Sequence, residues 1–341
     1  MSLIHIDGSE GEGGGQILRT SLALSIITGK PIRIDNIRAG RSKPGLLRQH
    51  LASVKAAVEI SRAKAEGVAL GSTALTFHPG NVTAGEYRFS IGSAGSALLV
   101  FQTILLPLLH ADAPSTVTIE GGTHNPFAPP FPFIEKTFLP LLHQIGYQVE
   151  VKLERPGFYP AGGGIITATI TPGGKRRVLK IGPRTEILDR EAIGVVANLS
   201  RKIAERELER LGSAMSLVPD EMCIHEINDT PGPGNALFVK LRSSQLTETF
   251  SSFGEQGRHA EKVADGLHDE VRRYLKSNGA VGEHLADQLL LPLALAKGGV
   301  FTTLPPSRHT QTNIAVIGRF LDARINVRKI DRLDYEIEVK P

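Results

Sequence analysis

The chain has 341 residues, of which 41% are hydrophobic and 22% charged, and its formal net charge is +4. This length suits one large α/β domain plus a smaller one, and the apolar runs are too short for a membrane span. The single Cys223 excludes an internal disulfide, and the start lacks a signal-peptide pattern, so we expect a reducing, cytoplasmic setting.

The first predicted element is a glycine-rich turn that runs into an apolar helix, at residues 11–29. Two later stretches, 92–111 and 279–298, follow the same pattern. The first two begin roughly 80 residues apart, which suits a repeated strand and helix unit. The third begins too late for that spacing, and an inserted segment of roughly 90 residues would explain the offset.

The glycine-rich turn at residues 11–19 is a candidate anion site, because backbone N–H groups at the start of a helix can receive a phosphate. It lacks the Gly-Lys-Ser/Thr ending of a P-loop and does not complete a dinucleotide-binding pattern. Glu12, the one carboxylate between these glycines, could hold a divalent cation beside phosphates. The alternative is that Glu12 only complements the helix dipole.

The next stretch, 38–50, is basic and ends at the titratable His50. Its four fixed cations are Arg38, Arg41, Lys43 and Arg48. Pro44 and Gly45 keep its first half out of a helix, which predicts a loop whose guanidinium groups converge on phosphates. The alternative is a solvated basic face.

Short runs of alternating polar and apolar residues predict half-buried strands, and we expect sheets with helices on one face. These runs are residues 31–37, 75–78, 116–120, 149–153, 165–170 and 335–339.

Residues 185–276 have element signals of their own and predict a small inserted α+β domain, which leaves 1–184 and 277–341 as the main domain. The predicted elements of the insert are helices at 189–211 and 260–276, strands at 215–217 and 236–242, and a turn at 229–235.

The third glycine-rich turn leads into His284, Asp287 and Gln288 at the start of an apolar helix. Asp287 could orient a nucleotide or an imidazole. An acid in a first helical turn is also common for the helix dipole alone.

His309 follows a stretch that prolines keep extended, and Thr312 or Asn313 is predicted to cap a helix over residues 314–321. The positive end of that helix would disfavour imidazolium and leave a lone pair for nucleophilic attack. The alternative is an inert loop histidine. No His-Glu-x-x-His or Cys-x-x-Cys spacing occurs, so a zinc site has little support.

Taken together, these stretches resemble the RNA 3′-terminal phosphate cyclase family over essentially the whole chain. The stretches that carry the resemblance are residues 7–19, 37–50, 87–102, 157–164 (GFYPAGGG), 231–235 (PGPGN), 280–292 and 309–321 (HTQTNIAVIGRFL). The resemblance implies an α/β (α+β) fold of repeated βαβαββ units, similar to the C-terminal domain of translation initiation factor three and to the enolpyruvyl transferases, with a smaller inserted domain.

The resemblance also implies roles for individual residues. His309 matches the family's histidine nucleophile, which ATP adenylates, and Glu12 matches the ligand of Mg²⁺ or Mn²⁺. Residues that match phosphate or RNA contacts are Arg19, Arg38, Arg41 and Gln49. Residues that match the nucleotide pocket are Gln102, Pro129, His284, Asp287 and Gln288.

Two positions depart from the family pattern. Bacterial members carry a tyrosine at the position of His284, where an imidazole would have to stack on adenine instead. His124 stands where an aspartate is often found.

The activity implied is the ATP-dependent conversion of an RNA 3′-phosphate into a 2′,3′-cyclic phosphodiester through a histidine–AMP intermediate, with release of AMP and pyrophosphate. The partners implied are ATP and RNA with a 3′-phosphate end, without a membrane, and the oligomeric state is open, a homodimer included. Two alternatives are a non-catalytic cyclase-like ribosome-assembly factor, which would lack the histidine, and an enolpyruvyl transferase, which has no use for it.

Overall fold

The computed structural model describes residues 3–341, whose strands form four sheets of four strands each. Three of these sheets share one plan. The first two strands run parallel, and the last two form an antiparallel pair whose final strand joins the second strand. A helix follows each of the first two strands in every unit, which confirms the expected repeated βαβαββ units.

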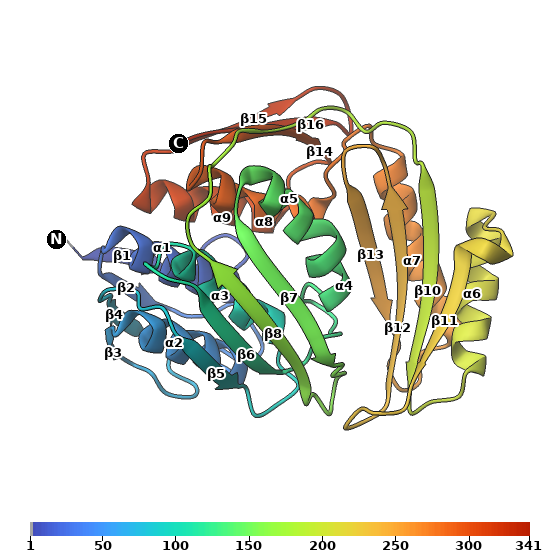
Figure 1. Cartoon of the computed structure of the whole chain (residues 1–341), viewed down its shortest axis with the longest axis horizontal. Helices are drawn as coiled ribbons and strands as arrows, with labels where there is room; N and C mark the ends of the chain where they lie inside the picture. Colours follow the sequence, from blue (N-terminus) through green and yellow to red (C-terminus); the bar gives the residue numbers. More distant parts are fainter. Residues whose placement is uncertain (1–2) are drawn as a thin grey trace.

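The three units follow one another along the chain (Figure 1). The first comprises β1 (Ile4–Asp7), α1 (Gly15–Thr28), β2 (Ile32–Asp35), α2 (Arg48–Ser61), β3 (Lys64–Glu66) and β4 (Leu75–His78). The second comprises β5 (Glu86–Ser90), α3 (Ala97–Leu108), β6 (Ser115–Gly121), α4 (Phe131–Phe133), the π-helical turn η1 (Ile134–Phe138), α5 (Leu139–Ile145), β7 (Gln148–Arg155) and β8 (Gly164–Thr171). The third comprises β9 (Leu179–Ile181), α8 (Glu283–Ala294), β14 (Gly299–Thr303), α9 (Arg308–Phe320), β15 (Arg324–Lys329) and β16 (Tyr335–Lys340).

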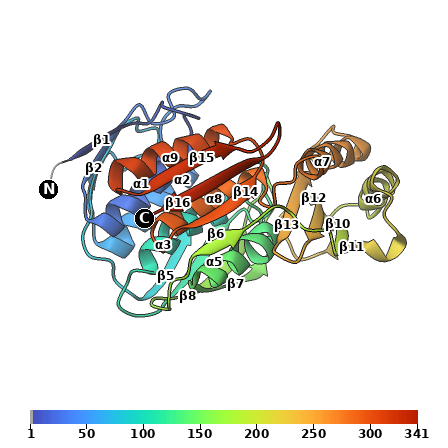
Figure 2. The same cartoon turned by 90° about the horizontal axis from the view of Figure 1, so that it is seen from above.

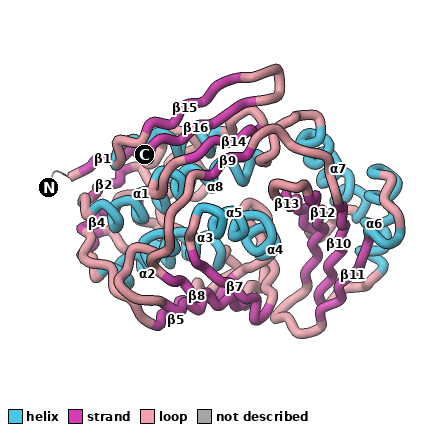
Figure 3. Tube along the Cα trace, turned by 45° about the horizontal axis from the view of Figure 1, so that its top comes forward, coloured by secondary structure: helices cyan, strands magenta, loops and turns pink. Residues whose placement is uncertain are grey.

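Helices of the three units pack against one another, and their sheets lie around the outside (Figure 3). The sequence explains this arrangement, because a helix that is apolar on every side must be buried. In α3 every residue except Gln102 is buried, and one continuous core contains Leu22 of α1, Phe101 of α3 and Leu289 of α8. The glycine-rich turns that open these three helices therefore each lead into one shared core.

An inserted segment leaves the third unit after β9 and returns at α8. It comprises β10 (Asp189–Ala197), α6 (Lys202–Met215), the 3₁₀ turn η2 (Pro219–Glu221), β11 (Met222–Ile227), β12 (Gly234–Arg242), β13 (Thr247–Phe253) and α7 (Ala260–Leu275). Its sheet, in the order β11-β10-β12-β13, packs with α6 and α7 around buried residues such as Leu208, Val239 and Leu267 (Figure 2).

The inserted segment contacts the helices of the main body through β13. Glu248 is buried, and its Oε2 accepts a hydrogen bond from the backbone N–H of Gly282, directly before α8, at 2.9 Å. Burial raises the pKa of Glu248 to about 8. The next residue, Thr249, accepts a hydrogen bond from Thr137 of η1 at 2.9 Å.

Two element predictions for the insert were wrong. Residues 189–211 do not form one helix, because 189–197 are the strand β10 and the helix α6 begins only at Lys202. The buried apolar run of β10 lies between two partner strands, which is the environment that favours β-branched residues. Residues 215–217 are not a strand either, since Met215 ends α6 and Ser216 adopts a left-handed conformation.

The six strands predicted outside the insert are present as β2, β4, β6, β7, β8 and β16. Within residues 3–341, no helix combines the length and the apolar character needed to cross a membrane.

Candidate functional site

The glycine-rich turn between β1 and α1 lies directly against α9 and α2. Gly11 has φ of +60°, a region that favours glycine, and a Cβ atom there would lie 2.1 Å from the hydroxyl oxygen of Thr312. A Cβ atom at Gly15 would lie 2.5 Å from Nε2 of His50. The backbone N–H of Glu12 donates to the Thr312 hydroxyl at 3.0 Å. Glycine is therefore needed for the first and last helices of the main body to approach each other here.

His309 lies in the first turn of α9. The predicted helix start at residue 314, with Thr312 or Asn313 as its cap, was wrong. Ser307 is the N-cap instead, and its hydroxyl accepts from the backbone N–H of Thr310 at 3.1 Å. The His309 side chain is 51% exposed, so it is open to a ligand while its backbone is fixed by the helix.

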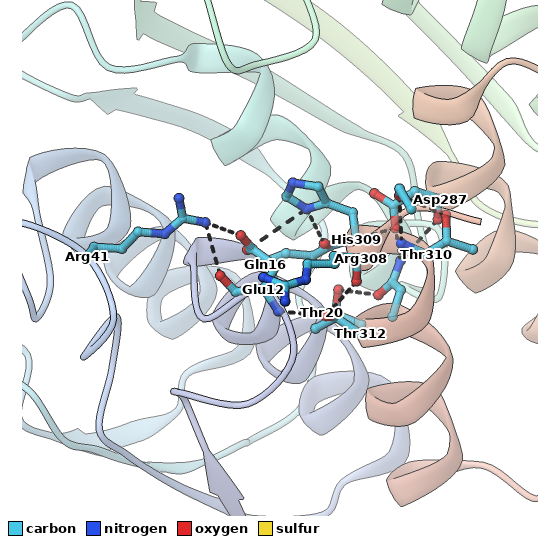
Figure 4. Close-up of polar contacts among 11 residues, drawn as sticks. Glu12, Gln16, Thr20, Arg41, Asp287, Arg308, His309, Thr310 and Thr312 are labelled. Atoms are coloured by element: carbon cyan, nitrogen blue, oxygen red, sulfur yellow. Dashed lines mark hydrogen bonds and ion pairs between the residues drawn. The ribbon is translucent and has the colours of Figure 1, made fainter. Parts of the chain in front are cut away.

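A chain of hydrogen bonds joins His309 to two other helices (Figure 4). Its Nδ1 lies 2.7 Å from Oε1 of Gln16 in α1, and the amide nitrogen of Gln16 donates to Oδ1 of Asp287 in α8. Asn313 of α9 also donates to Oδ1 of Asp287, at 3.0 Å. Burial raises the pKa of Asp287, against the opposing effects of Gln16, His309, Arg19 and Asn313.

Glu12 is the second partner of the histidine. Its carboxylate is 6% exposed, and Oε1 lies 3.9 Å from Nδ1 of His309. Oε2 forms an ion pair with Arg41, which also donates to the Glu12 carbonyl at 3.1 Å. Figure 4 shows Arg41 reaching the carboxylate from the side opposite α9. The basic loop and the histidine thus meet at one carboxylate.

Two further arginines carry positive charge close to this point. Burial lowers the pKa of Arg19 to about 10, although Glu12 and Asp287 oppose the change, so the guanidinium stays charged at neutral pH. Arg38 has φ of +56° and donates to the carbonyl of Gly45 at 3.0 Å. Burial and the charge of Arg41 lower the pKa of Arg38.

His50 is a buried neutral histidine beneath the turn. Burial, Arg19 and Arg38 lower its pKa to about 3. Its Nδ1 accepts from the backbone N–H of Leu47 at 3.3 Å, which leaves the ring proton on Nε2, next to Gly15. His50 therefore offers an N–H donor to the glycine-rich turn without adding a charge.

The other residues expected at the site are only partly joined to this cluster by hydrogen bonds. The side-chain amide of Gln102 in α3 donates to the side-chain oxygen of Gln288 in α8 at 2.5 Å. Gln288 directly follows Asp287 in the sequence. Gln49 accepts from the backbone N–H of Ser96 at 2.6 Å. His284 is exposed, and its Nε2 lies 3.7 Å from the Glu270 carboxylate of α7.

Pro129 lies in the loop before α4. Among residues 3–341, no hydrogen bond links Gln49, Pro129 or His284 to His309 or Glu12.

His124, the second departure from the family pattern, is a packed core residue. It is 5% exposed, and its ring centroid lies 5.0 Å from that of Phe158. Its Nδ1 lies 2.8 Å from the Thr123 hydroxyl, and burial lowers its pKa to about 4. It is therefore neutral at pH 7.

Sequence reasoning did not find Gln16. It follows three glycines and matches no catalytic motif, and its partner His309 is 293 positions away. One signal was available in the sequence, because Gln16 is a polar residue at the start of an apolar helix. The structure shows that its side chain is only 6% exposed. A buried amide needs hydrogen-bond partners, so its position implies specific contacts.

A resident metal centre does not fit the described part of the chain. No group of three or more His, Cys, Asp or Glu side chains within residues 3–341 could hold an ion. Glu12 supplies one carboxylate, and Arg41 pairs with its Oε2. A single carboxylate is nevertheless sufficient for a Mg²⁺ ion whose other ligands are phosphate oxygens and water.

The arrangement combines a half-exposed imidazole, charged guanidinium groups and a glycine-rich turn at the start of a helix. Guanidinium groups and helix N-termini bind phosphate oxygens, and a neutral imidazole is a nucleophile. The site can therefore hold a polyphosphate and attack a phosphorus atom.

Comparison with known proteins shows which family the chain resembles. A family model described as RNA 3′-terminal phosphate cyclase matches residues 10–327. The RNA 3′-terminal phosphate cyclase of Koribacter versatilis (strain Ellin345) is 49% identical over 327 residues, which cover 96% of this chain and 92% of that protein. Among solved structures, the enolpyruvyl transferase NikO from Streptomyces tendae matches with a TM-score of 0.29 and 16% identity, covering 51% of this chain and 33% of that chain.

Proposed function

The chain belongs to the RNA 3′-terminal phosphate cyclase family, and we propose that it converts an RNA 3′-phosphate end into a 2′,3′-cyclic phosphodiester, with ATP as the energy source. The observation that supports this proposal most directly is the half-exposed imidazole of His309, hydrogen-bonded through Nδ1 and flanked by Glu12 and Arg41. A scaffold protein without catalysis has no need of such a histidine.

In the first proposed step, Nε2 of His309 attacks the α-phosphorus of ATP. A nitrogen–phosphorus bond forms, the bond to the bridging oxygen breaks, and pyrophosphate leaves. Arg19, Arg38 and Arg41 would offset the negative charge that develops on the phosphate oxygens, which is the dominant requirement in such transfers. A divalent cation that arrives with ATP would meet Glu12 and lower the charge of the same oxygens.

In the second step, an oxygen of the RNA 3′-phosphate attacks the same phosphorus, and the bond to His309 breaks. In the third step, the neighbouring 2′-OH attacks the RNA phosphorus, AMP leaves, and the hydroxyl proton passes to solvent. The last attack is intramolecular, and such proximity can contribute roughly 7 to 11 kcal/mol. The ribose therefore supplies much of what a catalytic base would otherwise provide.

The proposed adenosine pocket lies between α3 and α8. The Gln102–Gln288 hydrogen bond fixes two amides beside Asp287, and amides of this kind can read the edge of a base. His284 and Pro129 are proposed as the two faces that enclose the adenine, and Gln49 as a contact to phosphate or RNA. Residues 185–276 are proposed as a domain inserted into the catalytic repeats.

The test of this function is transfer of labelled AMP to the protein. We expect wild-type protein incubated with α-labelled ATP and Mg²⁺ to form an adduct that is labile in acid and stable in base, as phosphoramidates are. His309→Ala should abolish the adduct, and the exposed, remote His78→Ala should leave it unchanged. An undiminished adduct in His309→Ala would exclude this nucleophile.

The full reaction is tested with a 3′-phosphorylated oligoribonucleotide, whose end should become resistant to phosphatase only when ATP is present. An enolpyruvyl transferase or a scaffold protein would release no pyrophosphate from ATP in this assay.

A further inference from the structure

A neutral imidazole can attack through only one of its two nitrogens, and the side-chain contacts of the ring decide which one. The nitrogen that carries hydrogen has no available lone pair, so the tautomer determines whether Nδ1 or Nε2 is the nucleophile. In His309, Nδ1 faces Gln16 and Glu12, while Nε2 lies on the other side of the ring (Figure 4).

The orientation of the Gln16 amide follows from its second partner. The amide nitrogen of Gln16 donates to Oδ1 of Asp287, so the NH₂ group of Gln16 is the side that faces Asp287. Asn313 donates to the same Oδ1, and its own amide is fixed because its oxygen accepts from the Thr20 hydroxyl at 2.8 Å. With its NH₂ on Asp287, Gln16 presents its oxygen to His309.

An oxygen at 2.7 Å from Nδ1 requires a hydrogen on Nδ1. The Glu12 carboxylate, 3.9 Å from the same nitrogen, favours that hydrogen as well. Gln16, Asp287 and Asn313, from three helices, therefore favour one tautomer together with Glu12 of the glycine-rich turn. In this tautomer Nε2 keeps its lone pair. His50, whose Nδ1 accepts a hydrogen bond, has the opposite tautomer.

We propose that Gln16 is a positioning residue that transmits the orientation of Asp287 to His309, holds the ring hydrogen on Nδ1 and leaves Nε2 free to take AMP. This proposal rests on the proposed function of His309. Attack through Nε2 moves no proton, so the adduct retains hydrogen on Nδ1 and carries a positive charge opposite the Gln16 oxygen and Glu12. That charge makes the ring a better leaving group when the RNA phosphate attacks.

The test reads the tautomer directly, by nitrogen-15 NMR of the histidine rings in the protein without ATP. Wild type should show His309 with hydrogen on Nδ1. Gln16→Met, which keeps the side-chain length and removes the amide, should mix the two tautomers. It should slow adenylylation by on the order of 10- to 100-fold, the range found when a metal-bound histidine loses the partner that orients its ring. Gln311→Met, on the exposed side of α9, is the matched control. It should change neither the tautomer of His309 nor the rate of adenylylation.

A paired substitution separates this role from a purely structural one. Asp287→Asn allows the Gln16 amide to turn over and should shift hydrogen to Nε2, with a loss of adenylylation. Adding Gln16→Glu to that variant restores an acceptor that faces both the introduced amide and Nδ1, so it should return the ring to the wild-type tautomer. Asp287→Asn alone keeps the shape of the side chain, which leaves a test even if Gln16→Met does not fold.

Hydrogen on Nε2 in the wild type, or a tautomer that both single variants leave unchanged, would overturn the proposal. A wild-type protein with the expected tautomer but no AMP adduct would instead refute the proposed function and leave the role of Gln16 in orienting the ring intact.

Discussion

Gly11 illustrates how closely single residues are fitted at the site. Alanine there would adopt a left-handed conformation, which costs about 1 to 2 kcal/mol, and its Cβ would clash with Thr312. We expect Gly11→Ala to lower the melting temperature and to abolish the AMP adduct, because the turn must move away from α9. Gly29→Ala is the matched control: its φ is +68°, but no atom lies within 4 Å of the added Cβ. If the two variants lose the same stability and Gly11→Ala still forms the AMP adduct, the close approach of the glycine-rich turn to α9 has no functional role.

His124 should make stability depend on pH. Its pKa is about 4 in the folded protein and near its ordinary 6.5 in the unfolded chain, so unfolding takes up a proton between these values. The stabilisation is complete above pH 6.5 and is lost as the pH falls towards 4, at up to about 1.4 kcal/mol per pH unit. His124→Gln should reduce this slope, measured by urea unfolding at several pH values. If the dependence of stability on pH is unchanged in this variant, the His124 ring is already solvated in the folded protein.

At the level of the element, the start of α9 determines where the His309 ring lies. Ser307→Ala removes the N-cap, at a cost of about 1 kcal/mol, and should also slow adenylylation because the first helical turn carries His309. Ser307→Asp restores an acceptor and should recover both properties. Ser96→Ala removes the cap of α3 instead and is the control. Equal loss of adenylylation in the two alanine variants would show that the effect is general destabilisation.

Part of the main body could be predicted from the sequence, namely six of its strands and the starts of α1, α3 and α8. The remaining strands, the helix α2 and the closing contacts of the site could not. The glycine-rich starts of α1, α3 and α8 are local signals, and so is the alternation in β4 or β16. Ser307 was overlooked because Thr312 and Asn313 also have capping side chains, and only the backbone decides between them. Gln16 could not be assigned a role, since its contact with His309 exists only once α1 and α9 pack together.

For the whole molecule, the plan of three similar units predicts that the inserted segment can be removed. The ends of the insert lie close together, since the backbone N–H of Arg184 donates to the carbonyl of Asn278 at 2.7 Å. Replacing residues 185–276 by a short flexible linker should leave a protein that unfolds cooperatively and still forms the AMP adduct. It should be less stable, because α8 loses its contact with Glu248.

Removing residues 86–171 instead should abolish folding, because this deletion takes away α3, which belongs to the shared core. Circular dichroism during heating distinguishes the two deletions. A failure of the first deletion to fold would show that the insert is part of the cooperative core.

The two sides of the site come from opposite ends of the sequence, as the Glu12 to Thr312 hydrogen bond spans 300 positions. During synthesis on the ribosome, the N-terminal carboxylate and amide emerge long before the helix that bears the imidazole. Under the proposed function, a nascent chain that stops before α9 lacks the imidazole that would accept AMP. Adenylylation would therefore have to wait until α9 has been synthesised.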